Sequence, residues 1–173
     1  MRYLPITEED RAAGQELADI LTPLSKAWGT DLGVEITSLA IQVYGGMGYI
    51  EETGVAQHFR DARIAPIYEG TNGIQAMDLV GRKLPMRGGA AVGDFIDRIE
   101  ALDEQLAAAG EDLSSIRNGL TKGVVALRTA TSWLLEHGRA DPFDALAAAT
   151  PYLRLFSVVT AGRMVALQAL AAH

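Results

Sequence analysis

The spacing of apolar residues in the first quarter of the chain restricts its fold more than any other feature. Between Thr22 and Tyr44 an apolar side chain recurs every three or four positions, which places the set on one face of a helix. The set consists of Leu24, Trp28, Leu32, Ile36, Leu39 and Val43. It stops at Gly45 and Gly46, which can adopt the positive φ of a helix C-cap. We therefore predict one long helix over residues 22–44.

Start and stop signals mark further helices on both sides of this one. Thr7 is followed by three acidic residues, which predicts an N-cap and a helix that runs to about Leu21. A proline at position 23, Pro23, then restarts or kinks the helix. Residues 45–54 predict a glycine-interrupted loop, and residues 55–64 predict a helix of mixed polarity.

A turn at Ala65 and Pro66 should end that helix. Thr71 or Asn72 can cap the next one, and Pro85 should stop it. Its predicted apolar face consists of Ile74, Met77, Val80 and Leu84.

Residues 86–93 predict a linker, because they are small or glycine and have no periodic apolar face. We place a domain boundary there, with a helical bundle in residues 1–87 and an antiparallel three-helix unit in 91–173. Asp141 should cap the last helix, which Pro151 should bend without ending. The three predicted apolar faces are Phe95, Ile99, Leu102 and Leu106; Ile116, Leu120, Val124, Leu127, Thr131 and Leu134; and Leu146, Leu153, Phe156, Thr160, Met164 and Leu167. No strand-like alternation of useful length occurs, so the predicted fold class is all-α.

Composition excludes several classes of function. The 173 residues carry a formal net charge of −7 with a pI near 4.9, which argues against nucleic-acid and membrane partners. There is no cysteine, and the three histidines lack metal-binding spacing, so we predict no metal site. The first ten residues lack signal-peptide features, and no apolar run approaches the roughly 18 residues of a spanning helix. A cytoplasmic location is the resulting expectation.

Glu69 is the residue with the most chemical interest, and its neighbours leave two interpretations open. A carboxylate near a helix N-terminus can simply be a favourable surface charge. Alternatively, Ile67 and Tyr68 could desolvate it and make it a stronger base, while Gly70 lets a ligand approach the backbone. That arrangement suits a general base for a weakly acidic C–H bond.

Other polar and aromatic groups are predicted to be structural. Residues 42–48 contain three glycines at a helix end, which indicates either a cap with a tight turn or close backbone approach to a phosphate-bearing cofactor. Adjacent Glu51 and Glu52 are predicted to be solvated, and Arg60, Asp61 and Arg63 to form structural ion pairs. Trp28 and Trp133 lie on apolar faces and are predicted to be core residues.

Three separated motifs, taken in order, resemble the C-terminal helical domain of the acyl-CoA dehydrogenases. KAW with Asp31, then IQVYGGMGYIEETG, then FRDARIAPIYEGTNGIQAMDLVGRKL cover about residues 20–85. The segment EETGVAQHFRDARIAPIYEGTNGIQAMDLVGRKL looks most similar to the longer acyl-CoA dehydrogenases, which carry an added helical C-terminal domain. Some of those act on 3-methylthiopropanoyl-CoA. Residues 91–173 are consistent with that extension.

The resemblance implies a reaction and a set of site residues. In the family, FAD oxidises an acyl-CoA thioester to the trans-2-enoyl-CoA, and a glutamate removes the α-proton. The matching base is Glu69, with Tyr68 and Gly70 beside the substrate. The positions that match cofactor contacts are Gln42, Val43, Tyr44, Gly45, Gly46, Thr71, Asn72 and Gly73. The first five of these meet the FAD of a neighbouring subunit in the family, which implies a homo-oligomer.

The resemblance also implies partners that the sequence does not contain. The family's N-terminal helical domain and β-barrel domain hold most flavin and substrate contacts, and neither has a counterpart here. We therefore expect a C-terminal portion that binds FAD weakly or not at all by itself. An electron-transfer acceptor would complete the reaction. The alternatives are a helical interaction module without activity and a portion of an acyl-CoA oxidase.

Overall fold

The computed structural model describes residues 7–138 and 140–173 as a series of helices. No strand occurs within these described residues, and the predicted all-α fold is confirmed. The helices are α1 (Glu8–Tyr44), α2 (Gly46–Tyr49), α3 (Val55–Ile64), α4 (Asn72–Asp78), α5 (Ala90–Glu100), α6 (Leu102–Ala108), α7 (Ser114–His137) and α8 (Pro142–Ala172). A π-helical turn, Leu79–Lys83, extends α4, and short 3-10 turns lie at Glu51–Thr53, Met86–Gly89 and Glu111–Leu113.

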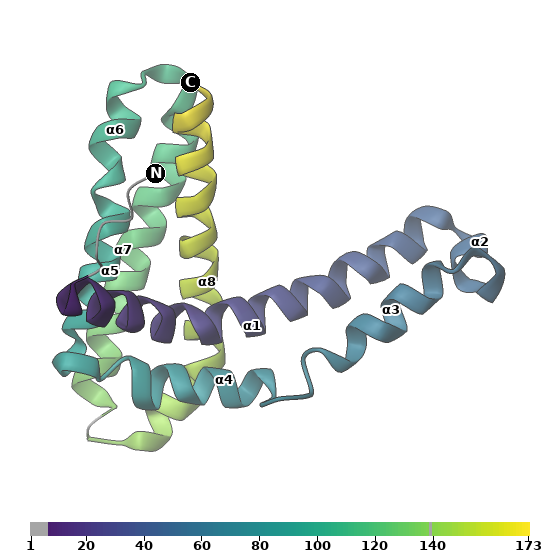
Figure 1. The fold of residues 1–173 in the computed structure, drawn as a ribbon, viewed down its shortest axis with the longest axis horizontal. Helices are drawn as coiled ribbons and strands as arrows, with labels where there is room; N and C mark the ends of the chain where they lie inside the picture. The colour runs from purple at the N-terminus through teal and green to yellow at the C-terminus, as the bar shows by residue number, and fades with distance from the viewer. Residues whose placement is uncertain (1–6, 139) are drawn as a thin grey trace.

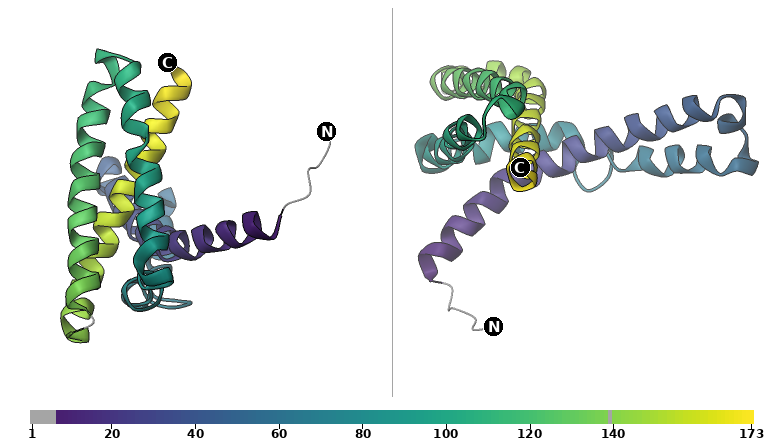
Figure 2. Two further views of the ribbon diagram at one scale, coloured as in Figure 1. Left: turned by 90° about the vertical axis from the view of Figure 1, so that its left-hand side faces the viewer. Right: turned by 90° about the horizontal axis from the view of Figure 1, so that it is seen from above.

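The first helix begins and ends where its caps were predicted. The Thr7 hydroxyl accepts a hydrogen bond from the Asp10 amide at 3.0 Å, and Gly45 ends the helix with a φ of 60°. Of the two alternatives at Pro23, the helix continues through the proline as α1. The view from above in Figure 2 shows α1 changing direction after its first part. A proline inside a helix removes one backbone hydrogen bond and commonly produces such a bend.

The distal half of α1 and α3 lie side by side as an arm that extends from the rest of the molecule (Figure 1). The predicted loop over residues 45–54 is wrong in detail, since α2 and a 3-10 turn occupy most of it. Gly48 is the residue that permits this fold at the tip. A Cβ built on Gly48 would lie 2.4 Å from the Ile41 carbonyl oxygen, so no larger residue fits.

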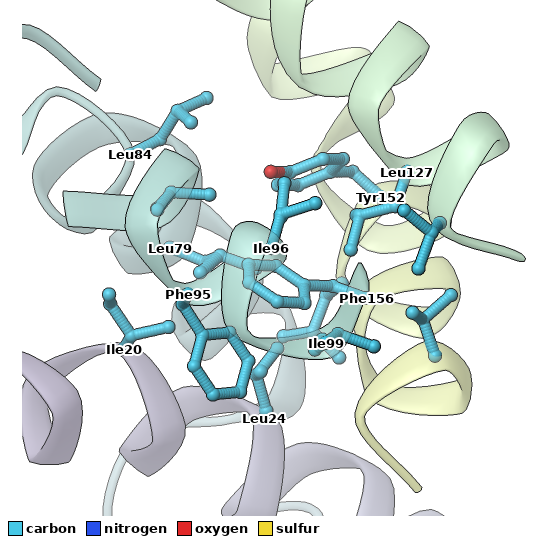
Figure 3. Close-up of a cluster of buried hydrophobic side chains, with 14 of the residues drawn as sticks. Ile20, Leu24, Leu79, Leu84, Phe95, Ile96, Ile99, Leu127, Tyr152 and Phe156 are labelled. Carbon is cyan, nitrogen blue, oxygen red and sulfur yellow. The ribbon is translucent and has the colours of Figure 1, made fainter. Parts of the chain in front are cut away.

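Helices α5, α6, α7 and α8 run alongside one another as a bundle (Figure 1). The first part of α1 and helix α4 cross this bundle. Figure 3 shows side chains from both sets of helices meeting in one core. The labelled residues are Ile20, Leu24, Leu79, Leu84, Phe95, Ile96, Ile99, Leu127, Tyr152 and Phe156. The hydrophobic core is therefore continuous across the predicted boundary between residues 1–87 and 91–173.

The predicted linker is a packed turn instead of a loose connection. Arg87, Gly88 and Gly89 all have positive φ, and α5 begins directly after them. The Arg87 guanidinium bonds to Glu16 at 2.8 Å and to Asp94 at 2.7 Å, which ties the turn to α1 and α5. The predicted end of the linker at residue 93 is wrong, because residues 90–93 form the first turn of α5, in which Ala91 and Val92 are buried.

Two sequence-based predictions about the buried face of helix α8 are wrong. Leu146 and Met164, both predicted to lie on the apolar face of this helix, are 43% and 49% exposed. The buried face is shifted and consists of Ala149, Tyr152, Leu153, Phe156, Ser157, Val159 and Ala166. Trp133 on α7 is also 40% exposed and stacks on His137, with ring centroids 4.8 Å apart. Helical spacing gives a face but does not say which neighbour covers it.

The expectation that no apolar run approaches membrane-spanning length is also wrong. By length and composition α8 could cross a membrane, with a mean hydropathy of 1.5 over its most apolar 18 residues. Of that window 22% is buried inside the structure. Packing against α7 is the most extensive contact that α8 makes.

Candidate functional site

Glu69 lies in the turn that connects α3 to α4. The amides of Ile67 and Tyr68 donate to the Ile64 carbonyl at 2.9 and 3.1 Å, and the Asn72 amide donates to the Pro66 carbonyl at 3.0 Å. Glu69 itself has a φ of 51°. A left-handed backbone costs a non-glycine residue about 1 kcal/mol or more, and such strain is common at functional sites.

The side chains around Glu69 leave it open to solvent. Glu69 is exposed, while Ile67 and Tyr68 are 49% and 51% exposed. The desolvation expected from these two neighbours is therefore not provided by the chain in this form. Water would have to be excluded by another surface that covers the turn.

Lys26 on α1 contacts the same turn from the side of the helix. Its Nζ donates to the Gly70 carbonyl at 2.8 Å and to Asn72 Oδ1 at 2.9 Å. The Asn72 Nδ2 in turn is directed at Asp31 Oδ1 at 2.7 Å and at Thr30 Oγ1 at 3.0 Å. We name Lys26, Thr30, Asp31 and Asn72 the α1 clamp. Sequence reasoning missed it, although Lys26 and Thr30 have the four-residue spacing of one helix face.

A cavity of about 270 Å³ lies beside the α1 clamp, between α1, α4 and α8. Asp31 and Asn72 from the clamp share its lining with Trp28, and α8 contributes Thr150 and Arg154. The C-terminal helix α8 therefore reaches the first residues of α4, which follow the Glu69 turn.

Thr71 or Asn72 was predicted to cap α4, and the Thr71 hydroxyl forms the cap. Its Oγ1 accepts a hydrogen bond from the Ile74 amide at 3.2 Å. The Asn72 side chain belongs to the α1 clamp, and its backbone N–H donates to the Pro66 carbonyl. Gly73 is exposed in the first turn of α4.

The second predicted group of cofactor contacts lies at the tip of the arm, well away from Glu69 (Figure 1). All five residues are exposed, with Val43 at 84% and Tyr44 at 56%. They are Gln42, Val43, Tyr44, Gly45 and Gly46. The ten residues of α3 separate the tip from the Glu69 turn, a rise of about 15 Å. One chain does not bring the two groups together.

Of the three α3 residues predicted to form structural ion pairs, Arg60 forms one. Its guanidinium bonds to Glu51 at 2.8 Å, and Asp61 accepts a hydrogen bond from Gln57 at 2.6 Å. Throughout residues 7–138 and 140–173, no group of three or more His, Asp or Glu side chains could hold a metal ion.

Two family models match this chain. The acyl-CoA dehydrogenase C-terminal domain matches residues 7–84, and the acetyl-CoA dehydrogenase C-terminal like family matches residues 90–173. The chain is 44% identical over 166 residues to 3-methylmercaptopropionyl-CoA dehydrogenase of Ruegeria pomeroyi. The aligned region covers 96% of this chain and 28% of that protein.

Shorter matches agree with that assignment. A butyryl-CoA dehydrogenase of Syntrophomonas wolfei is 41% identical over 97 residues, covering 52% of this chain and 16% of that protein. The short-chain acyl-CoA dehydrogenase of Megasphaera elsdenii is 48% identical over 54 residues, covering 31% of this chain and 14% of that protein. The chain thus spans less than a third of the length of these relatives. It belongs to the acyl-CoA dehydrogenase family, of which it carries the C-terminal helical domains.

Proposed function

We propose that the chain supplies the catalytic-base segment of an FAD-dependent acyl-CoA dehydrogenase that desaturates an acyl-CoA thioester between Cα and Cβ. The observation that carries this proposal is the position of Glu69. It occupies a strained left-handed turn, in the motif IYEGT, on a chain of this family. Strained backbone is common at functional sites, and here it occurs at the glutamate of a motif that the chain shares with this family, which supports a functional role for Glu69.

The proposed role of Glu69 is to remove the α-proton of the substrate. An α C–H bond beside a thioester is weakly acidic, so an exposed carboxylate in water is a poor base for it. When substrate and a covering surface exclude water from Glu69, the charged form loses solvation and the carboxylate becomes a stronger base. Tyr68 and Gly70 flank this position and would contact the acyl thioester.

The residues predicted to contact FAD suit an extended ligand. A Cβ built on Gly45 or Gly46 would meet nothing within 4 Å, so the backbone at the tip is open to close approach. Val43 and Tyr44 add exposed apolar surface there, and Gly73 and the backbones of Thr71 and Asn72 would contact FAD near the base. When bound, FAD would supply the oxidising chemistry by accepting the β-hydrogen as hydride.

Separation of the tip from the Glu69 turn supports a site shared between subunits. Two copies could place the tip of one arm against the Glu69 turn of another, which a single chain does not achieve. We also infer that the chain by itself binds FAD weakly, because both groups of contacts lie on open surface. Flavin absorbance that co-purifies with the isolated chain would contradict this inference.

The decisive experiment combines the chain with the N-terminal and β-barrel portions of a related dehydrogenase. Enoyl-CoA formation is then measured with an acyl-CoA substrate and an artificial electron acceptor. Glu69→Gln should lower kcat by about 10²–10⁴-fold, the usual contribution of a general base. Glu104→Gln, at an exposed position on α6, is the matched control and should leave kcat unchanged. Full activity of Glu69→Gln would refute the proposal.

A second candidate function is association without catalysis. The arm exposes apolar side chains on α1, among them Ile36 at 60% and Leu39 at 56%. Such a continuous apolar face marks a protein interaction site. Stable binding of the added portions without turnover would favour this function, and production of peroxide with turnover would indicate an oxidase.

A further inference from the structure

The left-handed turn at Glu69 requires something to hold it. Glu69 and Gly70 have consecutive positive φ values of 51° and 86°. The local backbone hydrogen bonds fix the turn through Ile67 and Tyr68 and through the Asn72 amide. The Gly70 carbonyl, which decides how the chain leaves the turn, bonds instead to Lys26, 44 residues earlier in the sequence.

The Lys26 ammonium is well suited to hold this carbonyl. It is partly buried against the turn and bonds to two acceptors there, Gly70 O at 2.8 Å and Asn72 Oδ1 at 2.9 Å. Hydrogen bonds from an ionised donor are about twice as strong as neutral ones, and partial burial strengthens them further. Lys26 therefore holds Gly70, which directly follows Glu69, and Asn72, the first residue of α4.

The Asn72 amide completes the attachment to α1. Its Nδ2 is directed at Ala27 O at 3.0 Å as well as at Thr30 and Asp31, while its Oδ1 accepts from Lys26. An amide side chain with both ends engaged cannot rotate without losing hydrogen bonds. The first residue of α4 is thus fixed to α1 by its side chain.

We propose that Lys26 is a positioning residue that, through Gly70 and Asn72, fixes the direction in which Glu69 presents its carboxylate. The catalytic meaning of this role rests on the proposed function of Glu69; the conformational role does not. Lys26 touches neither the reacting atoms nor the carboxylate. Misplacement of a catalytic group by about 1 Å can lower a rate about 10²-fold, so a clamp at this turn is sufficient to control turnover.

The first test needs no activity and uses the chain itself. Hydrogen–deuterium exchange is followed by mass spectrometry in Lys26→Met and in Lys122→Met, whose exposed lysine lies on α7. Peptides covering residues 65–75 should exchange at least tenfold faster in Lys26→Met, while peptides from α7 stay unchanged. Lys26→Arg should restore most of the protection, because arginine also donates to two acceptors. Unchanged exchange in 65–75, or equal acceleration throughout the chain, would overturn the proposal.

The second test uses the reconstituted enzyme described above. Lys26→Met should lower kcat at least tenfold with a KM for acyl-CoA within twofold of wild type, and Lys26→Arg should recover part of the loss. A rise in KM with unchanged kcat would contradict a positioning role. If wild type itself desaturates no acyl-CoA, the proposed function fails, whereas the exchange experiment still decides the role of Lys26 in the turn.

Discussion

Replacement of Phe156 tests whether the two predicted domains unfold as one unit. Phe156 on α8 is fully buried and packs against Phe95 and Tyr152, with ring centroids 5.8 and 5.9 Å apart. Phe156→Ala should cost about 4 kcal/mol, within the range of about 3–5 kcal/mol for a large aromatic-to-alanine change in a core. Because unfolding in urea has a slope of about 2 kcal/mol per molar for a chain of this size, the midpoint should fall by about 2 M.

The chain offers a direct way to follow each half separately. Trp28 lies on α1 in the first predicted domain and Trp133 on α7 in the second, and no other tryptophan is present. In Trp133→Phe and Trp28→Phe backgrounds, fluorescence during urea unfolding reports one half at a time. Since the core is continuous across residues 86–93, Phe156→Ala should lower both midpoints by the same amount.

The control for this prediction is Phe143→Ala at the start of α8. That side chain is 79% exposed, so its removal should change the free energy of unfolding by no more than about 0.5 kcal/mol. A fall in the Trp133 midpoint with an unmoved Trp28 midpoint would show two independent units. That result would refute the inference drawn from the shared core.

Three other outcomes are expected, one at a buried tyrosine and two at glycines. Burial raises the pKa of Tyr152 to about 12 from 10.0, so the contribution of Tyr152 to the free energy of unfolding should be constant below pH 10 and fall between about pH 10 and 12. Urea midpoints of Tyr152→Phe should lack this part of the decline, and a parallel decline would contradict the assignment. Gly89→Ala should lose about 1–3 kcal/mol in the same assay, because φ is 99° and the new Cβ would lie 2.6 Å from Leu135 Cδ1. Gly93→Ala, with open space inside α5, should gain about 0.5–1 kcal/mol, and equal effects of the two would be inconsistent with this reasoning.

Features that depend on neighbouring residues were predictable from the sequence. Thr7 and Asp141 cap their helices with bonds that span three residues or fewer, and Gly45 ends α1 with a positive φ. Such caps depend on side-chain chemistry and backbone conformation within one turn of helix. A short stretch of sequence is therefore enough to predict where the helix begins or ends. The stop at Pro85 has the same local origin.

Burial was less predictable, because it depends on which element covers a face. The periodic apolar set of α1 correctly includes Leu24 in the core, but Val43 on the same face is 84% exposed. Figure 1 shows α2 and α3 beside that part of α1, at a distance from the bundle. Trp133 is similar, since its helix has the expected period while the face that carries it is left partly open. Periodicity identifies an amphipathic helix and not its partner.

The candidate site depends both on local sequence and on contacts between distant residues. The residues around Glu69 could not distinguish a surface charge from a base, and its left-handed φ was not visible in the sequence. The bond from Lys26 to Gly70 spans 44 residues and depends on how α1 crosses α4. A single lysine on a helix carries no signal for such a contact. Only the resemblance of ordered motifs singled out this segment as the proposed site.

The structure separates two requirements that Glu69 must meet if it acts as the proposed base. Orientation of Glu69 comes from within the chain, through its turn and the α1 clamp, while exclusion of water does not, because Ile67 and Tyr68 are half exposed. A turn that is fixed beforehand loses little conformational entropy when another surface covers it, so more of the association energy remains for desolvation of the carboxylate. A clamp placed behind the turn therefore makes chemical sense at a site whose cover lies elsewhere. On this reasoning Lys26→Met should weaken turnover more than it weakens assembly.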